Sequence, residues 1–335
     1  MHGILAHLKA RGSYTASVDS LAWIMDTYEL TTQLKGMCPP QAANSSRGSS
    51  LRKGIMLLED FPVHVDNRAP NASGELKDAF AAFSERYRSE ARAAALEWVR
   101  GPKPQPGELQ VFKVYNMGYL LRTAGRMIVV DVFWDGTTAE AAQIASEADA
   151  FFLSHPHRDH WNPTMVDALA AAGVTLVLPA DICPQHGRKL VADSDWLEPV
   201  DVDGIKVQLL RGAQGPEPNN SYLVEFDGWR VLIPGENDNP DLYRPFSQFA
   251  APDLILHPTW NGLCALLDIV SEMPGYNPSK VTYIPGHDNE LYFHSVDHRE
   301  SYREMFSRED RLGDPGRTYP VIILQDIGET VTLKH

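Results

Sequence analysis

Residues 154–161 read Ser-His-Pro-His-Arg-Asp-His-Trp and are the most informative stretch of the sequence. Three histidines and an aspartate fall within six positions, directly after the apolar run Ala-Phe-Phe-Leu at 150–153. That run predicts a buried strand leading into a loop. Neutral imidazoles and carboxylates are the ligands that a borderline divalent ion such as zinc accepts, at about 2.0–2.2 Å. A histidine-rich surface loop is the alternative, but the composition, the spacing and the preceding strand favour a metal site.

The spacing within this stretch predicts ligands for two ions. Alternation along an extended loop lets His155 and His157 point one way, while Asp159 and His160 point another. Each ion then still needs ligands from elsewhere in the chain. One segment can therefore serve two ions that lie a few Å apart.

The pattern His155-x-His157-x-Asp159-His160 resembles the signature of the metallo-β-lactamase-fold hydrolases, and the resemblance extends over about residues 108–335. It implies an α/β fold, the αββα sandwich, with one or two divalent metal ions at the ends of its two central sheets. Zinc is the ion we expect, with manganese or iron as alternatives. Substrates in this family range from lactones and thioesters to phosphodiesters, so the resemblance fixes the fold better than the substrate. The branch it resembles most is that of the ascorbate-6-phosphate lactonase.

The resemblance also assigns roles to residues outside the histidine cluster. Asp131, near the end of a predicted strand, would lie beneath the metals and accept the other N–H of a ligand histidine, although it could simply start a turn. Pro285-Gly286-His287 resembles the fifth motif, so His287 is a predicted ligand. Gly235-Glu236 stands where the family has Gly-Asp, and we rank Glu236 above Asp238 as the ligand that bridges the two metals.

The chain departs from the family at the third motif, because residues 211–220 contain no histidine. The first ion, with His155 and His157, therefore lacks the third protein ligand that catalytic zinc normally has. Four residues are candidate replacements: Gln214, Glu217, Asn220 and His257. Side-chain oxygens would favour a harder ion such as manganese, while His257 could equally be a rim histidine with no metal role. We expect the second site, with Asp159, His160, His287 and Glu236, to be the better occupied.

The sequence pattern before residue 107 differs from the pattern after it. An apolar stripe at helical spacing predicts a helix over about 73–100. Its members are Leu76, Phe80, Phe83, Tyr87, Ala91, Ala94 and Trp98. The stretch 101–107 holds three prolines in five positions and predicts an extended connector. We therefore divide the chain into a helical extension, 1–106, and a metallo-β-lactamase-like domain, 107–335. The stripe packs on its own domain or forms a homodimer interface through the N-terminal helices.

Short elements come after the connector. Strands are predicted at about 109–115, 119–123, 127–132, 174–178, 202–210, 221–226, 229–233, 253–256 and 280–284. Helices are predicted over 137–147, over 262–273, and over 162–172, where Asn162 is the cap and Pro163 the first residue. Asp227-Gly228 predicts a hairpin turn. Residues 320–324 and 330–333 are expected to close the chain as a hairpin.

Composition limits the partners. The chain has 335 residues and a formal net charge of −14, which argues against nucleic-acid binding, since such proteins need a basic face. Three widely spaced cysteines, no signal-peptide run and no apolar stretch of membrane-spanning length predict a cytoplasmic protein with no membrane partner. We expect a metal-dependent hydrolase of a small molecule, a lactone, ester or phosphoester.

The expected nucleophile is a water molecule that a metal ion activates at neutral pH. Asp159 is the candidate to hold or deprotonate that water. The alternative is a degenerate member of the fold that binds a ligand or partner without turnover, and the missing third-motif histidine is the feature that supports it.

Overall fold

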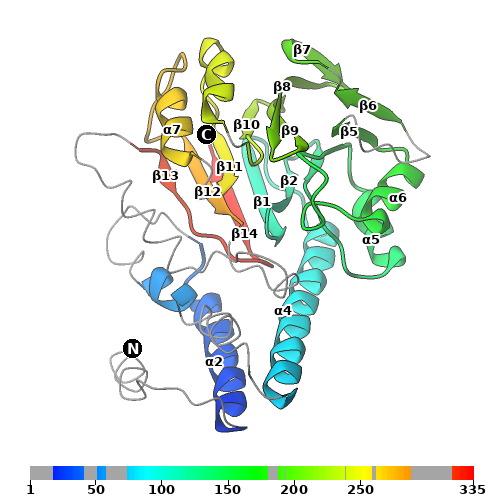
Figure 1. The fold of residues 1–335 in the computed structure, drawn as a ribbon, viewed down its shortest axis with the longest axis vertical. Helices are drawn as coiled ribbons and strands as arrows, with labels where there is room; N and C mark the ends of the chain where they lie inside the picture. Colours follow the sequence, from blue (N-terminus) through cyan, green and yellow to red (C-terminus); the bar gives the residue numbers. More distant parts are fainter. Residues whose placement is uncertain are drawn as a thin grey trace.

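A computed structural model describes residues 18–40, 51–57, 74–179, 188–192, 194–237, 239–258, 262–287 and 319–335. Two mixed sheets, each of seven described strands, pack face to face (Figure 1). The first has the order β14(Thr330–Lys334), β1(Glu108–Tyr115), β2(Gly118–Arg122), β3(Met127–Val130), β4(Ala150–Phe152), β5(Thr175–Pro179), β6(Lys189–Ala192). The second has the order β13(Val321–Ile322), β12(Thr282–Gly286), β11(Leu254–Pro258), β10(Trp229–Ile233), β9(Glu217–Phe226), β8(Ile205–Gln214), β7(Trp196–Val202).

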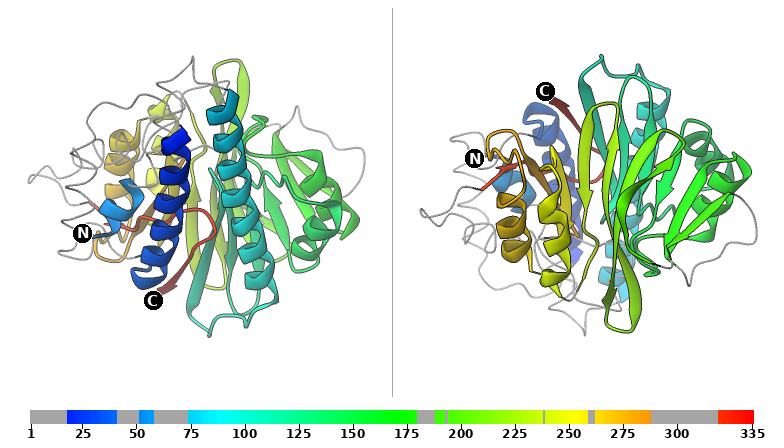
Figure 2. Two further views of the ribbon diagram at one scale, coloured as in Figure 1. Left: turned by 90° about the horizontal axis from the view of Figure 1, so that it is seen from below. Right: turned by 90° about the horizontal axis from the view of Figure 1, so that it is seen from above.

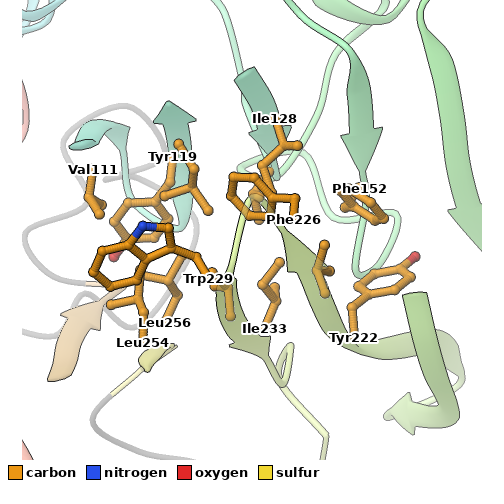
Figure 3. Close-up of a cluster of buried hydrophobic side chains, with 14 of the residues drawn as sticks. Val111, Tyr119, Ile128, Phe152, Tyr222, Phe226, Trp229, Ile233, Leu254 and Leu256 are labelled. Atoms are coloured by element: carbon orange, nitrogen blue, oxygen red, sulfur yellow. The ribbon is translucent and has the colours of Figure 1, made fainter. Parts of the chain in front are cut away.

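The two sheets enclose one apolar layer, to which alternate residues of each strand contribute. In β4, Phe152 points into this layer while Phe151 packs on the opposite face. Figure 3 shows side chains of the first sheet, such as Ile128, facing Phe226 and Ile233 of the second. Because both faces of β4 are covered, its sequence is a continuous apolar run, as expected for a buried parallel strand.

Helices cover the outer face of each sheet and complete an αββα sandwich. The helices α4(Gly74–Arg100), α5(Thr138–Ala145) and α6(Pro163–Ala171) lie on the first sheet, and the 3-10 helix η1(Pro240–Gln248) and α7(Leu263–Ser271) lie on the second (Figures 1 and 2). Asn162 caps α6 through a bond from the Met165 amide, with Pro163 at the first helical position. This confirms the predicted helix start.

The predicted C-terminal hairpin is wrong. β13 pairs in parallel with β12 in the second sheet, whereas β14 pairs antiparallel with β1 in the first. The segment between them crosses from one sheet to the other. Two short strands close in sequence resemble a hairpin, but here each completes the edge of a different sheet. The strands β6 and β7 were not predicted.

The N-terminal extension packs against the sandwich. Trp98 of α4 lies 5.5 Å from Phe112 of β1, measured between ring centroids, and the Arg122 guanidinium lies 4.0 Å above the Trp98 ring. The other long helix, α2(Val18–Met37), contacts α4 through Tyr28 and Phe83. The described part of the apolar stripe is therefore covered by this chain, and the homodimer stays a prediction.

Two ion pairs join the extension to the last turn of the chain. Lys35 pairs with the buried Asp326, and the fully buried Arg52 pairs with Glu329. Tyr87 of α4 also donates to Asp326. Buried charges are costly without partners, so removal of the extension would destabilise Asp326 by taking away its contacts with Lys35 and Tyr87. These contacts tie the extension to the sandwich, and the division at residue 107 stays a prediction.

We predict that a chain starting at Gly107 loses solubility relative to the full chain, because it exposes the apolar surface of β1 and removes the contact of Lys35 with the buried Asp326. Soluble yield and thermal unfolding of the two chains, prepared in parallel, measure the effect. A truncated chain as soluble and as stable as the whole would show that the extension is dispensable.

No helix among the described residues is long and apolar enough to cross a membrane.

Candidate metal centre

The candidate site lies where strands of both sheets end. The loop after β4 carries His155, His157, Asp159 and His160, while Glu236 follows β10 and His287 follows β12. Strands β3, β4 and β5 are mutually parallel, as are β10, β11 and β12, so their carboxyl ends meet at common edges. Carboxyl ends of parallel strands are the usual place for sites in α/β proteins. Residues far apart in the sequence are brought together there.

Four side chains converge most closely. The His160 Nε2 lies 3.4 Å from Asp159 Oδ2 and 3.1 Å from Glu236 Oε1. The His287 Nε2 lies 3.2 Å from the same Asp159 oxygen and 3.3 Å from the same Glu236 oxygen. Ligands placed tetrahedrally at about 2.0–2.1 Å from an ion are about 3.3–3.4 Å apart. These four distances between histidine nitrogens and carboxylate oxygens thus lie close to the spacing of ligands around a tetrahedral divalent ion.

A second group adjoins the first. The ligand atoms of His155, His157 and Glu236 all lie within 4.8 Å of one another. The His155 Nε2 is 3.8 Å from Glu236 Oε2, which is the other oxygen of the carboxylate that faces His160 and His287. Glu236 therefore presents one oxygen to each group, the arrangement of a bridging carboxylate. Asp238, the alternative bridge, lies outside the described residues.

The residues present fit a metal ion by their unsatisfied atoms. His155 Nε2, His160 Nε2 and Glu236 Oε1 are buried, and none of their contacts among the described residues has the geometry of a hydrogen bond. Buried polar atoms without partners are rare, because each costs about 1–3 kcal/mol. Divalent ions bound between these nitrogens and oxygens would supply the missing partners.

The electrostatics of the site also favour cations. Burial opposes the protonated form of His160, yet the carboxylates of Asp159, Glu236 and Asp131 raise its pKa well above its usual range. Burial alone would raise the pKa of Glu236, but His287, His160 and His155 lower it. The pKa of His160 is raised and that of Glu236 is lowered, so the surroundings of both side chains favour a positive charge next to the carboxylates.

His155 is held in the neutral form. Burial lowers its pKa well below the usual range, and the neighbouring His160 adds to the shift. A neutral imidazole is the form that binds a metal ion. Its Nδ1 contacts the Ser154 hydroxyl at 2.9 Å, which leaves Nε2 directed at Glu236. The orientation required of a ligand is therefore set by the protein.

Asp131 lies beneath the histidine loop. Its carboxylate accepts from the Ser154 amide and the Ser154 hydroxyl, each at 2.6 Å, and one oxygen lies 3.1 Å from His160 Nδ1. This contact leaves His160 Nε2 to face Asp159 and Glu236. An acceptor on the far nitrogen fixes the tautomer and orientation of a ligand histidine.

Residues that the sequence did not reveal support the site. Asn116, in the turn between β1 and β2, donates to Asp159 Oδ2 at 2.5 Å, and its carbonyl accepts from the His287 amide at 3.4 Å. Asn116, Asp131 and His287 all have positive φ, at 49°, 46° and 58°. Such strain gathers at functional sites when surrounding contacts enforce it. The signal available was weak: an asparagine in a tight turn, a residue that tolerates this conformation.

A buried lysine holds the turn that carries His287. Lys113, fully buried in β1, donates to the carbonyls of Pro285 and Gln325, each at 3.2 Å. The Tyr119 hydroxyl also donates to Pro285, at 3.3 Å. The apolar pattern of β1 gave no indication that Lys113 would be buried with its charge.

The four candidate replacements for the missing histidine lie in different surroundings. Gln214 Nε2 donates to Glu236 Oε2 at 2.8 Å. Asn220 instead donates to the Tyr222 hydroxyl at 3.0 Å. His257 has Nδ1 2.5 Å from the Pro258 carbonyl, burial lowers its pKa to about 4, and it belongs to neither ligand group. Glu217 is paired with Gln214 across the tip of the β8–β9 hairpin.

Residues 113–273 match the family model of the β-lactamase superfamily domain. Among solved structures, Igni18, a metallo hydrolase from Ignicoccus hospitalis KIN4/I, is similar with TM-score 0.50 and 14% identity over 68% of this chain and 99% of that one. The metallo-β-lactamase fold protein YhfI from Bacillus subtilis has TM-score 0.44 and 14% identity over 68% of this chain and 100% of that one. An isothiocyanate hydrolase from Delia radicum gut bacteria has TM-score 0.46 and 13% identity over 68% and 100%. No curated protein matches the chain.

The fold and the family match agree. Residues 113–273 match the β-lactamase superfamily domain, and the sandwich that contains them has the metallo-β-lactamase fold. The resemblance drawn from His155 to His160 is thereby confirmed at the level of the superfamily. Within that class, the particular reaction has to be argued from the site.

Proposed function

We propose that this protein is a metal-dependent hydrolase of a small molecule, with a lactone, ester or phosphoester as the substrate. The observation that carries the proposal is the convergence of Asp159, His160, Glu236 and His287, whose facing atoms lie 3.1–3.4 Å apart. The first group, His155 and His157, shares Glu236 with them. Two divalent ions would occupy these groups, with zinc proposed for the tighter one and manganese or iron as alternatives.

A divalent ion bound here would act as a Lewis acid and would lower the pKa of a water molecule toward neutrality. The chain's own residues bind and orient. Asp159 is half-buried and ionised: burial opposes its charge, but His160 and His287 lower its pKa well below the usual range. Such a carboxylate is a strong acceptor, so it would hold the ion and orient the attacking water rather than store its proton. Asn116 fixes the Asp159 oxygen that faces the two histidines.

The substrate class follows from this chemistry and from the charge of the chain. Attack by water requires an electrophilic carbonyl or phosphoryl centre, which the three substrate types share. The formal net charge of −14 disfavours polyanions such as RNA or DNA. Within small molecules, the lactonase-like branch is the narrower proposal, supported by the retained pair of Asp159 and His160.

The proposal is tested by assaying the purified protein against a panel of lactones, carboxylic esters and phosphodiesters, before and after chelation. We expect hydrolysis of at least one class, loss of activity with chelator, and recovery when a divalent ion is added back. Asp159→Asn should lower the rate by about 100-fold or more, the usual scale for a group that acts on the reacting water. Asp167→Asn, an exposed aspartate of α6, is the matched control and should leave the rate unchanged.

Metal-loaded protein that binds compounds of the panel but hydrolyses none would contradict the enzyme and support the alternative, a member of the fold that binds without turnover. Hydrolysis that survives complete metal removal would contradict the metal-dependent reaction.

A further inference from the structure

The side chain of Gln214 stands in an unusual position for a residue at a hairpin tip. It ends β8, one residue before Gly215, whose φ of +56° forms the turn into β9. Its Nε2 donates to Glu236 Oε2 at 2.8 Å, while its Oε1 is buried and has no hydrogen-bond partner within the described part of the chain. A side-chain amide can both donate and accept hydrogen bonds. Here the NH₂ group donates a hydrogen bond, whereas the carbonyl oxygen accepts none from the described residues.

The contact falls on the first ligand group. Glu236 Oε2, the atom that Gln214 holds, is the oxygen facing His155 Nε2 at 3.8 Å, whereas Oε1 faces the second group. Gln214 is therefore adjacent to the group that lacks a third histidine. The β8–β9 hairpin is the part of the fold that contains the histidine-free stretch 211–220.

We propose that Gln214 takes the place of the missing histidine and completes the first ion site, with Oε1 as a metal ligand and Nε2 holding Glu236. This inference rests on the proposed metal function. It accounts for both halves of the amide. Nε2 orients the bridging carboxylate, and Oε1, which has no hydrogen-bond partner among the described residues, would bind the ion.

The other replacements are less suitable. Asn220 already donates to the Tyr222 hydroxyl, and its backbone amide donates to the Ser154 carbonyl at 2.7 Å, so it joins the two sheets. His257 directs Nδ1 at its neighbouring carbonyl and packs beside Tyr243, with ring centroids 6.4 Å apart. Gln214 is thus the candidate that contacts a ligand residue directly.

The donor set determines which ion the site prefers. Two imidazoles, one carboxylate and one amide oxygen form a harder set than three imidazoles, so the preference for zinc over manganese should be weaker than at a three-histidine site. The first site would then differ from the second in both affinity and selectivity.

The test is the number of Mn²⁺ ions bound per chain, measured by equilibrium dialysis and elemental analysis on the full-length protein. We expect Gln214→Leu to weaken binding of the first ion by more than about 10-fold, because it removes a ligand as well as the bond that orients Glu236, and to leave the second unchanged. Gln208→Leu is the matched control: it lies on the same strand and donates to the Leu197 carbonyl, outside both ligand groups.

A double variant identifies which ion is affected. Gln214→Leu combined with His155→Ala should retain one ion, like each single variant, because both changes act on the same site. A double variant that binds no ion would place Gln214 at the second site and overturn the inference. Two ions of unchanged affinity in Gln214→Leu would overturn it as well, while leaving the proposed function intact.

The variant Gln214→His tests the role as a ligand rather than as a support alone. A third imidazole should restore the usual donor set and raise the ratio of zinc to manganese affinity at the first site by about tenfold or more. An unchanged ratio, with both ions still bound, would show that Gln214 does not contact the ion. Unaltered protein that binds no ion would overturn the proposed function and this inference together.

Discussion

Glu236→Ala is expected to empty both ion sites. One oxygen of this carboxylate lies 3.1 and 3.3 Å from His160 and His287, and the other lies 3.8 Å from His155. Because Glu236 contacts both ligand groups, its removal takes one ligand from each ion. It also removes the negative charge that lies between the two groups. The loss in affinity should exceed about 100-fold, the upper range for removing only an outer partner of a ligand.

Metal content of Glu236→Ala after dialysis, measured beside the unaltered protein, gives the result. Glu272→Ala, at the exposed end of α7, is the matched control and should keep every ion. Loss of a single ion from Glu236→Ala would show that the carboxylate serves one site and would contradict the bridge. We expect the variant to stay folded, because Glu236 lies after β10 and outside the apolar layer between the sheets. Circular dichroism then distinguishes metal loss from unfolding.

The two histidine groups should also differ in how tightly they hold their ions. His287→Ala is expected to remove more metal than His155→Ala, because the His287 Nε2 lies 3.2 and 3.3 Å from the carboxylate oxygens of Asp159 and Glu236. The first group is looser, with its His155–Glu236 distance at 3.8 Å, and it lacks a third histidine. A site close to the geometry its ion requires loses more when one ligand is taken away.

Ion counts on the two variants in one buffer measure this asymmetry. His335→Ala is a suitable control histidine, since it stacks on Trp229 with ring centroids 3.9 Å apart and lies in neither ligand group. Equal losses from His155→Ala and His287→Ala, or a greater loss from His155→Ala, would contradict the predicted order.

The sequence predicted those parts of the fold that local signals determine. The apolar run before His155, the cap Asn162 with Pro163, and the turn Asp227-Gly228 each act over a few residues, and each lies in the structure where it was expected. In the turn, Asp227 and Gly228 both have positive φ, as a tight hairpin requires. The histidine cluster was equally legible because four ligands lie in one loop.

Contacts between distant segments were not predictable in the same way. Nothing local distinguishes two strands of a hairpin from two strands of opposite sheets, and so β13 and β14 were wrongly paired. Asn116 is 43 residues from Asp159, and Lys113 is 172 residues from Pro285. Gln214 was one of four candidates in sequence, and its bond to Glu236 separated it from the rest.

The number of divalent ions per chain in protein purified without chelator is the decisive measurement for the two-ion site. The arrangement of His155, His157, Asp159, His160, Glu236 and His287 predicts two ions when the protein is saturated, one held more tightly than the other. A folded, full-length protein that binds no divalent ion at saturating concentration would contradict the assignment of these residues as metal ligands.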